Sequence, residues 1–414
     1  MGADRSLGVR RSRQPLGVRV VNGGGGALRR LGVSYPSFDE ASVIEAAQQE
    51  TGLEHFGSDD FREPLRILLA DLEHEARLTF VGRFAARSQA ITLLANRLRM
   101  QDWWTRHPEM LSAPVAAPWF VVGLPRSGTT LLQQLLACDP ENRSLLFWEA
   151  TCPAPPPERA TYEVDPRIPR AERAQRLLDY LAPDANRIHP VGAQLPTECV
   201  SLLAHSFASL EFGAINHVPN HLEWCLETDL TSHYEYFRSQ LQLLQWRCAG
   251  ERWTLKSPAH LLALAPLLKV FPDARVIWLH RDPALSVTSH CSLVSVLRAI
   301  GSNDVDRLAV GREWPRIWEV AVARALESRA SHAGAFHDVA YDDLVREPLG
   351  VVRQIYAWGG SVLEESAEEP MRRFLDAHRQ HARGVHRYDP RYFGLDSAEL
   401  RTHRFATYEA LFRN

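Results

Sequence analysis

The pattern of apolar and polar residues divides the chain of 414 residues into a helical first part and an alternating second part. From Pro36 to about Pro114, apolar residues recur three and four positions apart, as at Leu65, Leu68 and Leu72. That spacing predicts amphipathic helices. We expect them to form a packing layer, because they carry no motif that is typical of chemistry. The preceding residues 1–35 are rich in arginine and contain a run of four glycines, and they predict a flexible tail.

Beyond Pro118, short apolar runs alternate with helical stretches. A buried strand of a parallel sheet is a nearly continuous apolar run, and a crossover helix connects it to the next strand. The alternation therefore predicts an α/β fold with a central parallel sheet flanked by helices on both faces. The predicted strands span 119–122, 252–255, 275–279 and 336–340, and the helices that follow them span 129–137, 259–268, 283–300 and 342–345.

The same pattern predicts how the chain is organised. Residues 1–35 form the tail, 36–115 an N-terminal helical extension, and 116–414 one α/β domain with a helical insertion at about 151–250. The insertion begins with a proline-rich stretch at 152–157. Amphipathic spacing at 396–412 predicts a closing helix at the C-terminus.

Composition and charge narrow the class of protein. The formal net charge is −3, from 47 basic and 50 acidic residues, which excludes a generally basic nucleic-acid-binding surface. No apolar run reaches about 18 residues, so no transmembrane segment is predicted, and the N-terminus lacks the apolar region of a secretory signal. The six cysteines lie apart in apolar surroundings, which predicts buried free thiols and a cytoplasmic protein.

The strongest chemical signal is the segment Gly123-Leu124-Pro125-Arg126-Ser127-Gly128-Thr129-Thr130, between a predicted strand and a predicted helix. Its G-x-x-x-x-G spacing is that of a phosphate-binding P-loop. Glycines let the backbone wrap around an anion, successive N–H groups point inward, and the helix N-terminus adds a positive field. With this loop, the predicted fold becomes a P-loop three-layer sandwich.

The loop departs from the ATP-binding pattern at one position. The lysine that reaches the β- and γ-phosphates is absent, and Thr129 stands in its place. A positive charge occurs instead inside the loop, at Arg126. We therefore expect Arg126, Ser127, Gly128, Thr129 and Thr130 to bind a shorter anionic group than a triphosphate.

The run Pro-Arg-Ser-Gly-Thr-Thr at 125–130 resembles the 5′-phosphosulfate loop of sulfotransferases that use 3′-phosphoadenosine 5′-phosphosulfate (PAPS). It looks closest to the bacterial branch related to protein-tyrosine sulfotransferases, and cytosolic members typically have Lys at the position of Arg126. The resemblance covers roughly residues 118–400. It implies transfer of the sulfuryl group of PAPS to a hydroxyl of a small-molecule, lipid or glycan acceptor. It implies no metal, and the sequence has no metal-ligand spacing.

The resemblance also implies a second anion site, for the 3′-phosphate of PAPS. In the family this site is an Arg at a strand end with a Ser eight residues later, and here Arg281 and Ser289 have that spacing. An Arg fork can bind phosphate oxygens, and a hydroxyl can add one hydrogen bond. The alternative is a salt bridge between Arg281 and Asp282 at the helix start. Tyr341 opens a Y-x-x-L segment whose tyrosine contacts the nucleotide in the family, and a tyrosine that caps the core is the alternative.

Lysine is rare in this chain, because Lys256 and Lys269 are the only two among 47 basic residues. A GC-rich coding bias explains the count, but a lysine that remains can be held by chemistry that Arg cannot perform. Lys256 lies in a strand-end segment, 253–258, that resembles the family's segment near the transferring sulfuryl group. We expect Lys256 to stabilise charge on the leaving oxygen, with a surface lysine as the alternative. Lys269 has no such context and is expected to be solvated.

Two residues are candidates for the base that activates the acceptor hydroxyl. Glu149 has a position comparable with the catalytic glutamate of the tyrosine-sulfating relatives, and its alternative is a structural carboxylate paired with an Arg. His260 is the second candidate, because Pro258 replaces the histidine of the cytosolic relatives. Other candidates, for the acceptor pocket or for a loop that closes over the nucleotide, are His189, Glu198, Arg383 and Gly384.

Two other functions stay open at this point. A P-loop small-molecule kinase would need the P-loop lysine or an acidic strand end that binds Mg²⁺, and the likeliest strand end has Arg281 before Asp282. A non-catalytic nucleotide-binding protein would keep the loop but transfer nothing. The sequence determines neither the acceptor nor the oligomeric state, and a homodimer is one option.

Overall fold

The computed structural model describes residues 17–18, 20–24, 35–181, 192–377 and 389–412. Its centre is a five-stranded parallel sheet in the order β2-β3-β1-β4-β5. This confirms the predicted α/β class, although one strand was missed, because β2 has only three residues and no apolar run. The strands are β1 (Trp119–Gly123), β2 (Asn142–Ser144), β3 (Arg252–Lys256), β4 (Arg275–His280) and β5 (Phe336–Ala340).

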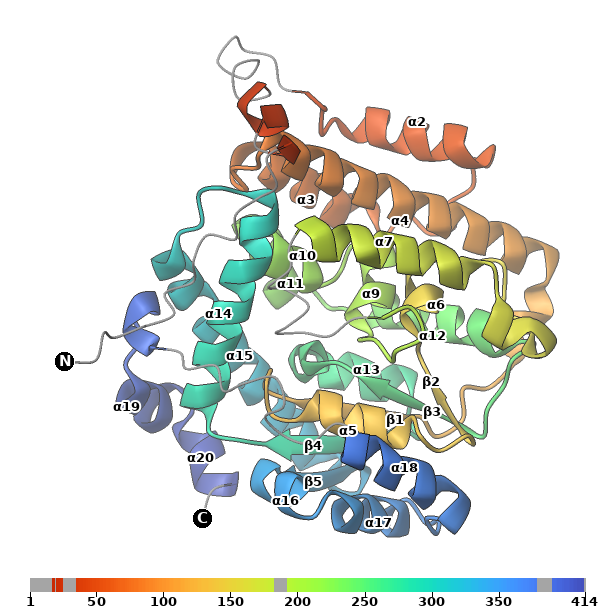
Figure 1. Ribbon diagram of the computed structural model, residues 1–414, viewed down its shortest axis with the longest axis vertical. Helices are drawn as coiled ribbons and strands as arrows, with labels where there is room; N and C mark the ends of the chain where they lie inside the picture. Colours follow the sequence, from red (N-terminus) through yellow and green to blue (C-terminus); the bar gives the residue numbers. More distant parts are fainter. Residues whose placement is uncertain (1–16, 19, 25–34, 182–191, 378–388, 413–414) are drawn as a thin grey trace.

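The pleat of β1 divides its side chains between two hydrophobic cores. Trp119 and Val121 belong to one core, and Phe120 and Val122 to the other, because successive side chains of a strand point to opposite faces. The first core is covered by α5 (Thr129–Leu136), α16 (Tyr341–Arg346), α17 (Pro348–Trp358) and α18 (Glu365–Ala377). The second is covered by α12 (Thr231–Gln245), α13 (Leu264–Val270), α14 (Pro283–Gly301) and α15 (Arg307–Ser331), so the sheet is the middle of three layers (Figure 1).

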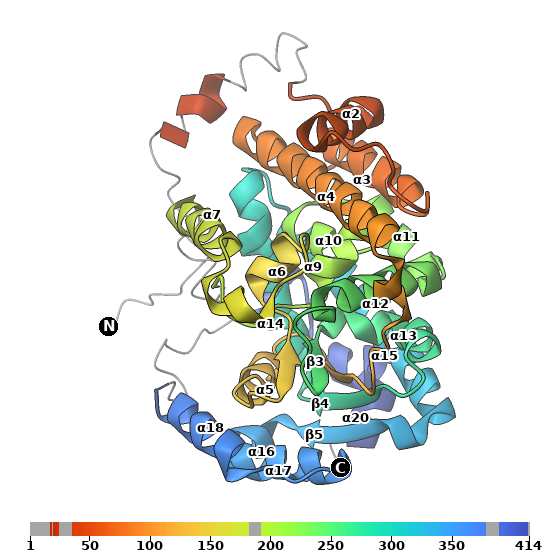
Figure 2. The ribbon, with the colours of Figure 1, turned by 90° about the vertical axis from the view of Figure 1, so that its right-hand side faces the viewer.

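The helices near the N-terminus, α2 (Glu40–Thr51), α3 (Arg62–His74) and α4 (Phe80–Arg106), form a third core together with a few residues between 204 and 218 of the insertion. Figure 2 shows them above the sheet, on the side away from α16, α17 and α18. One of their contacts with the P-loop domain is especially close. A Cβ atom on Gly82 would lie 2.0 Å from the carbonyl oxygen of Gly301, and the same oxygen accepts a hydrogen bond from the Thr79 N–H at 2.8 Å. The extension is thereby fixed to the last residue of α14.

Between β2 and β3 the chain forms mostly short helices: α6 (Phe147–Thr151), α7 (Arg167–Leu181), α9 (Val200–Leu203), α10 (Glu211–Ile215), α11 (Pro219–Glu227) and α12. The extended stretch before α9 is tied to the sheet region by two backbone hydrogen bonds. The Thr197 N–H donates to the Leu145 carbonyl at 2.8 Å, and the Cys199 N–H donates to the Lys256 carbonyl at 2.9 Å. This stretch therefore brings Glu198 to the carboxyl end of β3.

Two predicted helices differ in the structure. The helix expected at 259–268 begins as a 3₁₀ turn, Pro258–Ala263, before α13. The closing helix expected at 396–412 is broken into α19 (Ser397–Glu399), a π-helical turn (Leu400–Arg404) and α20 (Ala406–Phe412). Periodicity alone predicts one helix in both places, since it does not register a change in the number of residues per turn.

One helix of the described residues, α14, has the length and mean hydropathy of a membrane span, and 61% of that window is buried inside the fold. All six cysteines are free, as predicted, with Cys138 and Cys152 only partly buried. The division at 36–115 and 116–414 stays a prediction.

Candidate functional site

The predicted anion-binding residues meet where the sheet changes its winding direction. β1 and β4 are neighbours, with Gly123 beside Leu279. The helix that follows β1, α5, covers one face of the sheet, and the helix that follows β4, α14, covers the other. Strands whose crossover helices diverge in this way leave a crevice outside their carboxyl ends, where open α/β sheets bind ligands.

The P-loop after β1 has the backbone conformation of an anion-binding loop. Arg126 has φ +69° and Gly128 has φ +95°, so two residues adopt the left-handed region within three positions. A Cβ atom on Gly128 would lie 3.1 Å from the Tyr341 ring, which shows how closely the loop packs on the end of β5. Ser127 Oγ is buried and has no hydrogen-bond partner among the described residues. A buried hydroxyl needs a partner, and a ligand oxygen in the loop would supply it.

Arg281, the predicted ligand of the 3′-phosphate, reaches across the crevice to this loop. Its Nη1 donates a hydrogen bond to the Arg126 carbonyl at 2.6 Å, and its guanidinium lies 4.1 Å from the centre of the Tyr341 ring. The structure thus brings Arg126, Arg281 and Tyr341 together. Ser289 lies on α14 and is largely buried.

Asp282, the neighbour of Arg281, has other functions than the salt bridge considered from the sequence. Its carboxylate accepts from the Ala284 N–H at 2.8 Å, capping α14, and pairs with Arg401 at 2.7 Å. Burial raises the pKa of Asp282, but these hydrogen bonds outweigh it and the pKa is lowered. Both contacts fix the start of α14, directly after Arg281.

Lys256 ends β3 and is buried, with 1% of its surface exposed. Its Nζ lies 2.6 Å from Glu198 Oε1 and 3.5 Å from Thr130 Oγ1, in the first turn of α5. A surface lysine, the alternative considered from the sequence, is therefore wrong for Lys256. Lys269, in contrast, is exposed on α13. Lys256 is a positive charge held beside the P-loop.

Glu149 is buried completely, and its carboxylate is saturated with hydrogen-bond donors. Arg143 donates to both oxygens, with Nη1 at 3.0 Å from Oε2, and Tyr162 Oη and the Leu146 N–H donate to Oε2 at 3.0 and 3.1 Å. Burial raises the pKa of Tyr162, so its phenol stays a donor. This is the geometry of the structural alternative, a carboxylate paired with an Arg, and it leaves little of the carboxylate to accept a proton from a substrate.

His260 lies among aromatic side chains that pack against β1. Its Nδ1 is 2.7 Å from Tyr234 Oη, and its ring packs edge-on against Phe120. Burial lowers the pKa of His260 to about 3. The imidazole is therefore neutral at physiological pH and far too weak a base to activate a hydroxyl group.

The residue that sequence reasoning did not connect with Lys256 is Glu198. It comes from the insertion, 58 positions before Lys256, and no local pattern marks the contact. A second carboxylate, Glu211, lies within electrostatic reach of Glu198. Burial raises the pKa of Glu211 to about 7, and the Glu198 charge adds a smaller contribution in the same direction. Ser201 Oγ donates to Glu211 Oε2 at 3.2 Å. His189, Arg383 and Gly384, together with most of the predicted tail, lie outside the described residues.

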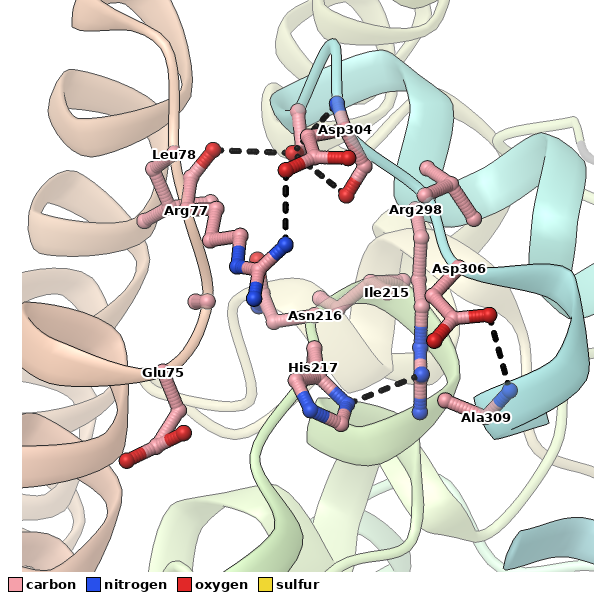
Figure 3. A pocket seen from close by; sticks show the side chains of 13 residues that line it. Glu75, Arg77, Leu78, Ile215, Asn216, His217, Arg298, Asp304, Asp306 and Ala309 are labelled. Atoms are coloured by element: carbon pink, nitrogen blue, oxygen red, sulfur yellow. Dashed lines mark hydrogen bonds and ion pairs between the residues drawn. The ribbon is translucent and has the colours of Figure 1, made fainter. Parts of the chain in front are cut away.

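A separate polar pocket, of about 60 Å³, lies between the N-terminal helices and the far end of α14 (Figure 3). Two of its charged residues, Arg77 and Asp304, pair with each other at 2.7 Å, and a third, Arg298, pairs at 2.9 Å with Glu313, which does not line the pocket. None of the residues predicted for the site lines it. Within the described ranges, no group of His, Cys, Asp and Glu side chains could hold a metal ion.

Comparisons with known proteins agree with this site. The model of a sulfotransferase family matches residues 118–365, which include the P-loop, Lys256 and Arg281. The crystal structure of sulfotransferase STF9 from Mycobacterium avium is similar over 92% of this chain and 98% of its own, with a TM-score of 0.85 and 33% identity. Sulfotransferase STF1 from Mycobacterium tuberculosis H37Rv is similar over 89% of this chain and 98% of its own, with a TM-score of 0.80 and 32% identity.

A curated relative is also similar in sequence. It is omega-hydroxy-beta-dihydromenaquinone-9 sulfotransferase Stf3 of Mycobacterium bovis, 27% identical over 249 residues. The aligned region is 58% of this chain and 61% of the relative's length.

Proposed function

The chain belongs to the sulfotransferase family, and from that premise we propose that it transfers the sulfuryl group of PAPS to a hydroxyl group of an acceptor. The observation that carries the proposal is the meeting of two anion-binding elements, the P-loop and Arg281, with the buried Lys256 beside the loop. A P-loop kinase is not favoured, because Thr129 replaces the P-loop lysine and the family is that of sulfotransferases.

The residues present suit the two ends of PAPS. The left-handed turns at Arg126 and Gly128 expose backbone N–H groups, and the unsatisfied Ser127 hydroxyl lies between them, which suits the 5′-phosphosulfate. Arg281, with Ser289 on α14, suits the 3′-phosphate, and Tyr341 packs beside both sites. No step requires a metal ion, since Arg126 and Lys256 supply positive charge.

We place the proton transfer on Glu198 and not on Glu149, because Glu149 is saturated with donors and Glu198 lies beside Lys256. The acceptor hydroxyl gives its proton to the Glu198 carboxylate while its oxygen forms a bond to sulfur. The bond between sulfur and the 5′-phosphate oxygen breaks, and that oxygen keeps the electron pair. Lys256 Nζ stabilises the negative charge that develops there. Positioning of the three groups in line contributes the rest of the acceleration.

The acceptor we propose is a lipid-like molecule with a terminal hydroxyl group. The support is the name of the curated relative, whose substrate is an omega-hydroxylated menaquinone derivative. A cytoplasmic location, where PAPS would be available, belongs to the same proposal.

Calorimetry with adenosine 3′,5′-bisphosphate tests the nucleotide site. We expect binding that Arg281→Ala abolishes and Arg312→Ala, on an exposed arginine of α15, leaves unchanged. Radiolabelled PAPS with a panel of phenols, sterols, glycans and polyprenyl alcohols then tests transfer. Tight binding of ATP with Mg²⁺, without binding of the bisphosphate, would overturn the proposal. Binding of the bisphosphate without transfer to any acceptor would favour a non-catalytic nucleotide-binding protein.

A further inference from the structure

The segment 389–412 packs against the strand end that precedes Arg281. His280, the last residue of β4, stacks on Phe412 of α20, with ring centres 3.7 Å apart and planes 8° from parallel. Tyr408, on the same helix, has 1% of its surface exposed. Its Oη accepts a hydrogen bond from the Arg281 N–H at 3.3 Å, and it lies 3.2 Å from His280 Nδ1. The segment therefore contacts the backbone of the proposed 3′-phosphate ligand.

The direction of these hydrogen bonds follows from Asp338 on β5. His280 Nε2 lies 2.8 Å from Asp338 Oδ1, and Arg329 pairs with the same carboxylate. Burial raises the pKa of Asp338, but the hydrogen bonds from His280 and Arg329 outweigh it and lower the pKa to about 2. An ionised carboxylate only accepts, so His280 Nε2 carries a proton and donates. Burial lowers the pKa of His280, so the ring is neutral at physiological pH and Nδ1 accepts.

Tyr408 joins this histidine to the backbone of Arg281. Because Nδ1 accepts, the Tyr408 hydroxyl donates to it, and the phenol oxygen keeps a lone pair for the Arg281 N–H. The three hydrogen bonds therefore form one ordered series, from the backbone N–H to the carboxylate.

The series fixes the backbone from which the Arg281 side chain extends. At the other end of that side chain, Nη1 donates to the Arg126 carbonyl at 2.6 Å. The following residue, Asp282, pairs with Arg401 of the same C-terminal segment at 2.7 Å. A guanidinium fork that binds phosphate needs a defined position, and here the segment 389–412 supplies part of it.

We propose that Tyr408, oriented by His280, is a positioning residue for Arg281 and thereby contributes to the selectivity of the nucleotide site for a 3′-phosphate. The inference rests on the proposed sulfotransferase function and assigns a part in it to the C-terminal segment. Tyr408 acts through the backbone of Arg281, so its hydroxyl should matter for nucleotides that carry a 3′-phosphate and matter little for those that lack one.

Calorimetry with two nucleotides tests this role, because adenosine 3′,5′-bisphosphate has the 3′-phosphate and adenosine 5′-phosphate lacks it. Tyr408→Phe removes one hydroxyl and keeps the ring that packs on His280 and Phe412. We expect the Kd of the bisphosphate to rise about fivefold and that of the monophosphate to stay within about twofold. Binding of the monophosphate also shows that the variant is folded. Tyr392→Phe, on an exposed tyrosine of the same segment, is the matched control and should change neither Kd.

Kinetics separate positioning from a general loss of structure. In Tyr408→Phe the KM of PAPS should rise about fivefold, while kcat and the KM of the acceptor stay within about twofold of the wild type.

A double variant tests the series itself. His280→Phe keeps a ring against Phe412 and removes the acceptor of the Tyr408 hydroxyl, so it should also weaken the bisphosphate. The combined variant, His280→Phe with Tyr408→Phe, should bind the bisphosphate as Tyr408→Phe alone does, because both changes act through one series.

An equal loss of affinity for both nucleotides in Tyr408→Phe overturns the inference, as does a bisphosphate Kd within about twofold of the wild type. Additive losses in the double variant overturn the part of His280. These outcomes differ from failure of the proposed function, in which the wild type itself neither binds the bisphosphate nor transfers sulfate.

Discussion

Two acid–base pairs beside the same sheet differ in how far they are exposed to solvent. Arg143 and Glu149 form a pair in which the carboxylate has no exposed surface and accepts four hydrogen bonds. Lys256 and Glu198 form a pair in which Nζ lies 2.6 Å from Oε1, and 22% of the Glu198 side chain is exposed. The first pair is closed off from solvent, whereas the second includes a carboxylate with exposed surface that a third molecule can reach.

The difference follows from the side chains that make each pair. The guanidinium of Arg143 is a planar fork that engages both carboxylate oxygens, and the rings of Tyr162 and Trp253 lie 5.0 and 4.7 Å from it. The ammonium of Lys256 is a compact charge with three donors, of which Glu198 takes one and Thr130 a weaker second. In a chain whose basic residues are nearly all Arg, the more exposed pair is the one that has kept its lysine.

The largest effect is expected from breaking the closed pair. Arg143→Ala leaves the Glu149 carboxylate buried without its main partner, which should lower the free energy of unfolding by about 3–5 kcal/mol. Denaturant unfolding followed by circular dichroism measures it. Arg173→Ala, on the exposed face of α7, is the control and should change little. A loss below about 1 kcal/mol in Arg143→Ala would mean that the pair is not structural.

Next in size is the effect of removing the proposed base. Glu198→Gln keeps the side-chain shape but cannot take a proton, so kcat should fall about 10²–10³-fold while the binding of adenosine 3′,5′-bisphosphate is kept. Glu149→Gln is the matched variant, and its folded fraction should keep kcat within about tenfold of the wild type. The opposite ranking of the two variants in single-turnover assays would return the base to Glu149.

Exchanging the lysines for arginine gives a smaller effect. Lys256→Arg places a larger planar group beside Thr130 and Glu198 in a buried position, and kcat should fall about tenfold or more. Lys269→Arg, on the surface of α13, should be indistinguishable from the wild type. Equal activity of both variants would show that coding bias alone accounts for the two lysines.

The smallest effect concerns the carboxyl group of Glu211, which is near the pair of Lys256 and Glu198. The pKa of Glu211 is about 7, against an ordinary 4.5, because burial and the Glu198 charge disfavour ionisation. Between these values the native state binds more protons than the unfolded state, so Glu211 makes stability fall as the pH rises from about 4.5 to 7. Glu211→Gln should therefore gain about 1–2 kcal/mol of stability relative to the wild type when the pH is raised from 5 to 6.5.

Thermal unfolding at both pH values measures this gain. The Glu198→Gln background should reduce it, because the neighbouring charge is gone. A gain that does not depend on pH would show that Glu211 ionises normally.

What the sequence predicted well is local in the chain. The P-loop needs only a strand, a tight turn and a helix within about 15 residues, and β1, its turn and α5 lie where the pattern placed them. Arg281 and Lys256 were identified because their segments resemble family motifs at strand ends, and the structure has Lys256 at the end of β3 and Arg281 directly after β4. The roles of these residues stay predictions.

What the sequence did not predict depends on distant contacts. Glu149 and Arg143 are six residues apart, but Arg143 lies on β2, whose three residues carry no strand pattern. Glu198 meets Lys256 because backbone hydrogen bonds of Thr197 and Cys199 guide the chain past the sheet edge, and no periodicity encodes that path. The partners of a carboxylate, and not its place in a motif, distinguish a structural role from a chemical one.

The hydrogen bond from Arg281 to the Arg126 carbonyl has a thermodynamic consequence for ligand binding. The guanidinium of Arg281 contacts the P-loop backbone and is also the proposed ligand of the 3′-phosphate, so an anion that immobilises Arg281 should immobilise the loop as well. The first anion to bind loses free energy by ordering Arg281 and the P-loop. The second anion then binds to groups that are already ordered. By linkage the effect is reciprocal: two half-ligands, one with each phosphate, are expected to bind with positive cooperativity of equal size in both orders of addition.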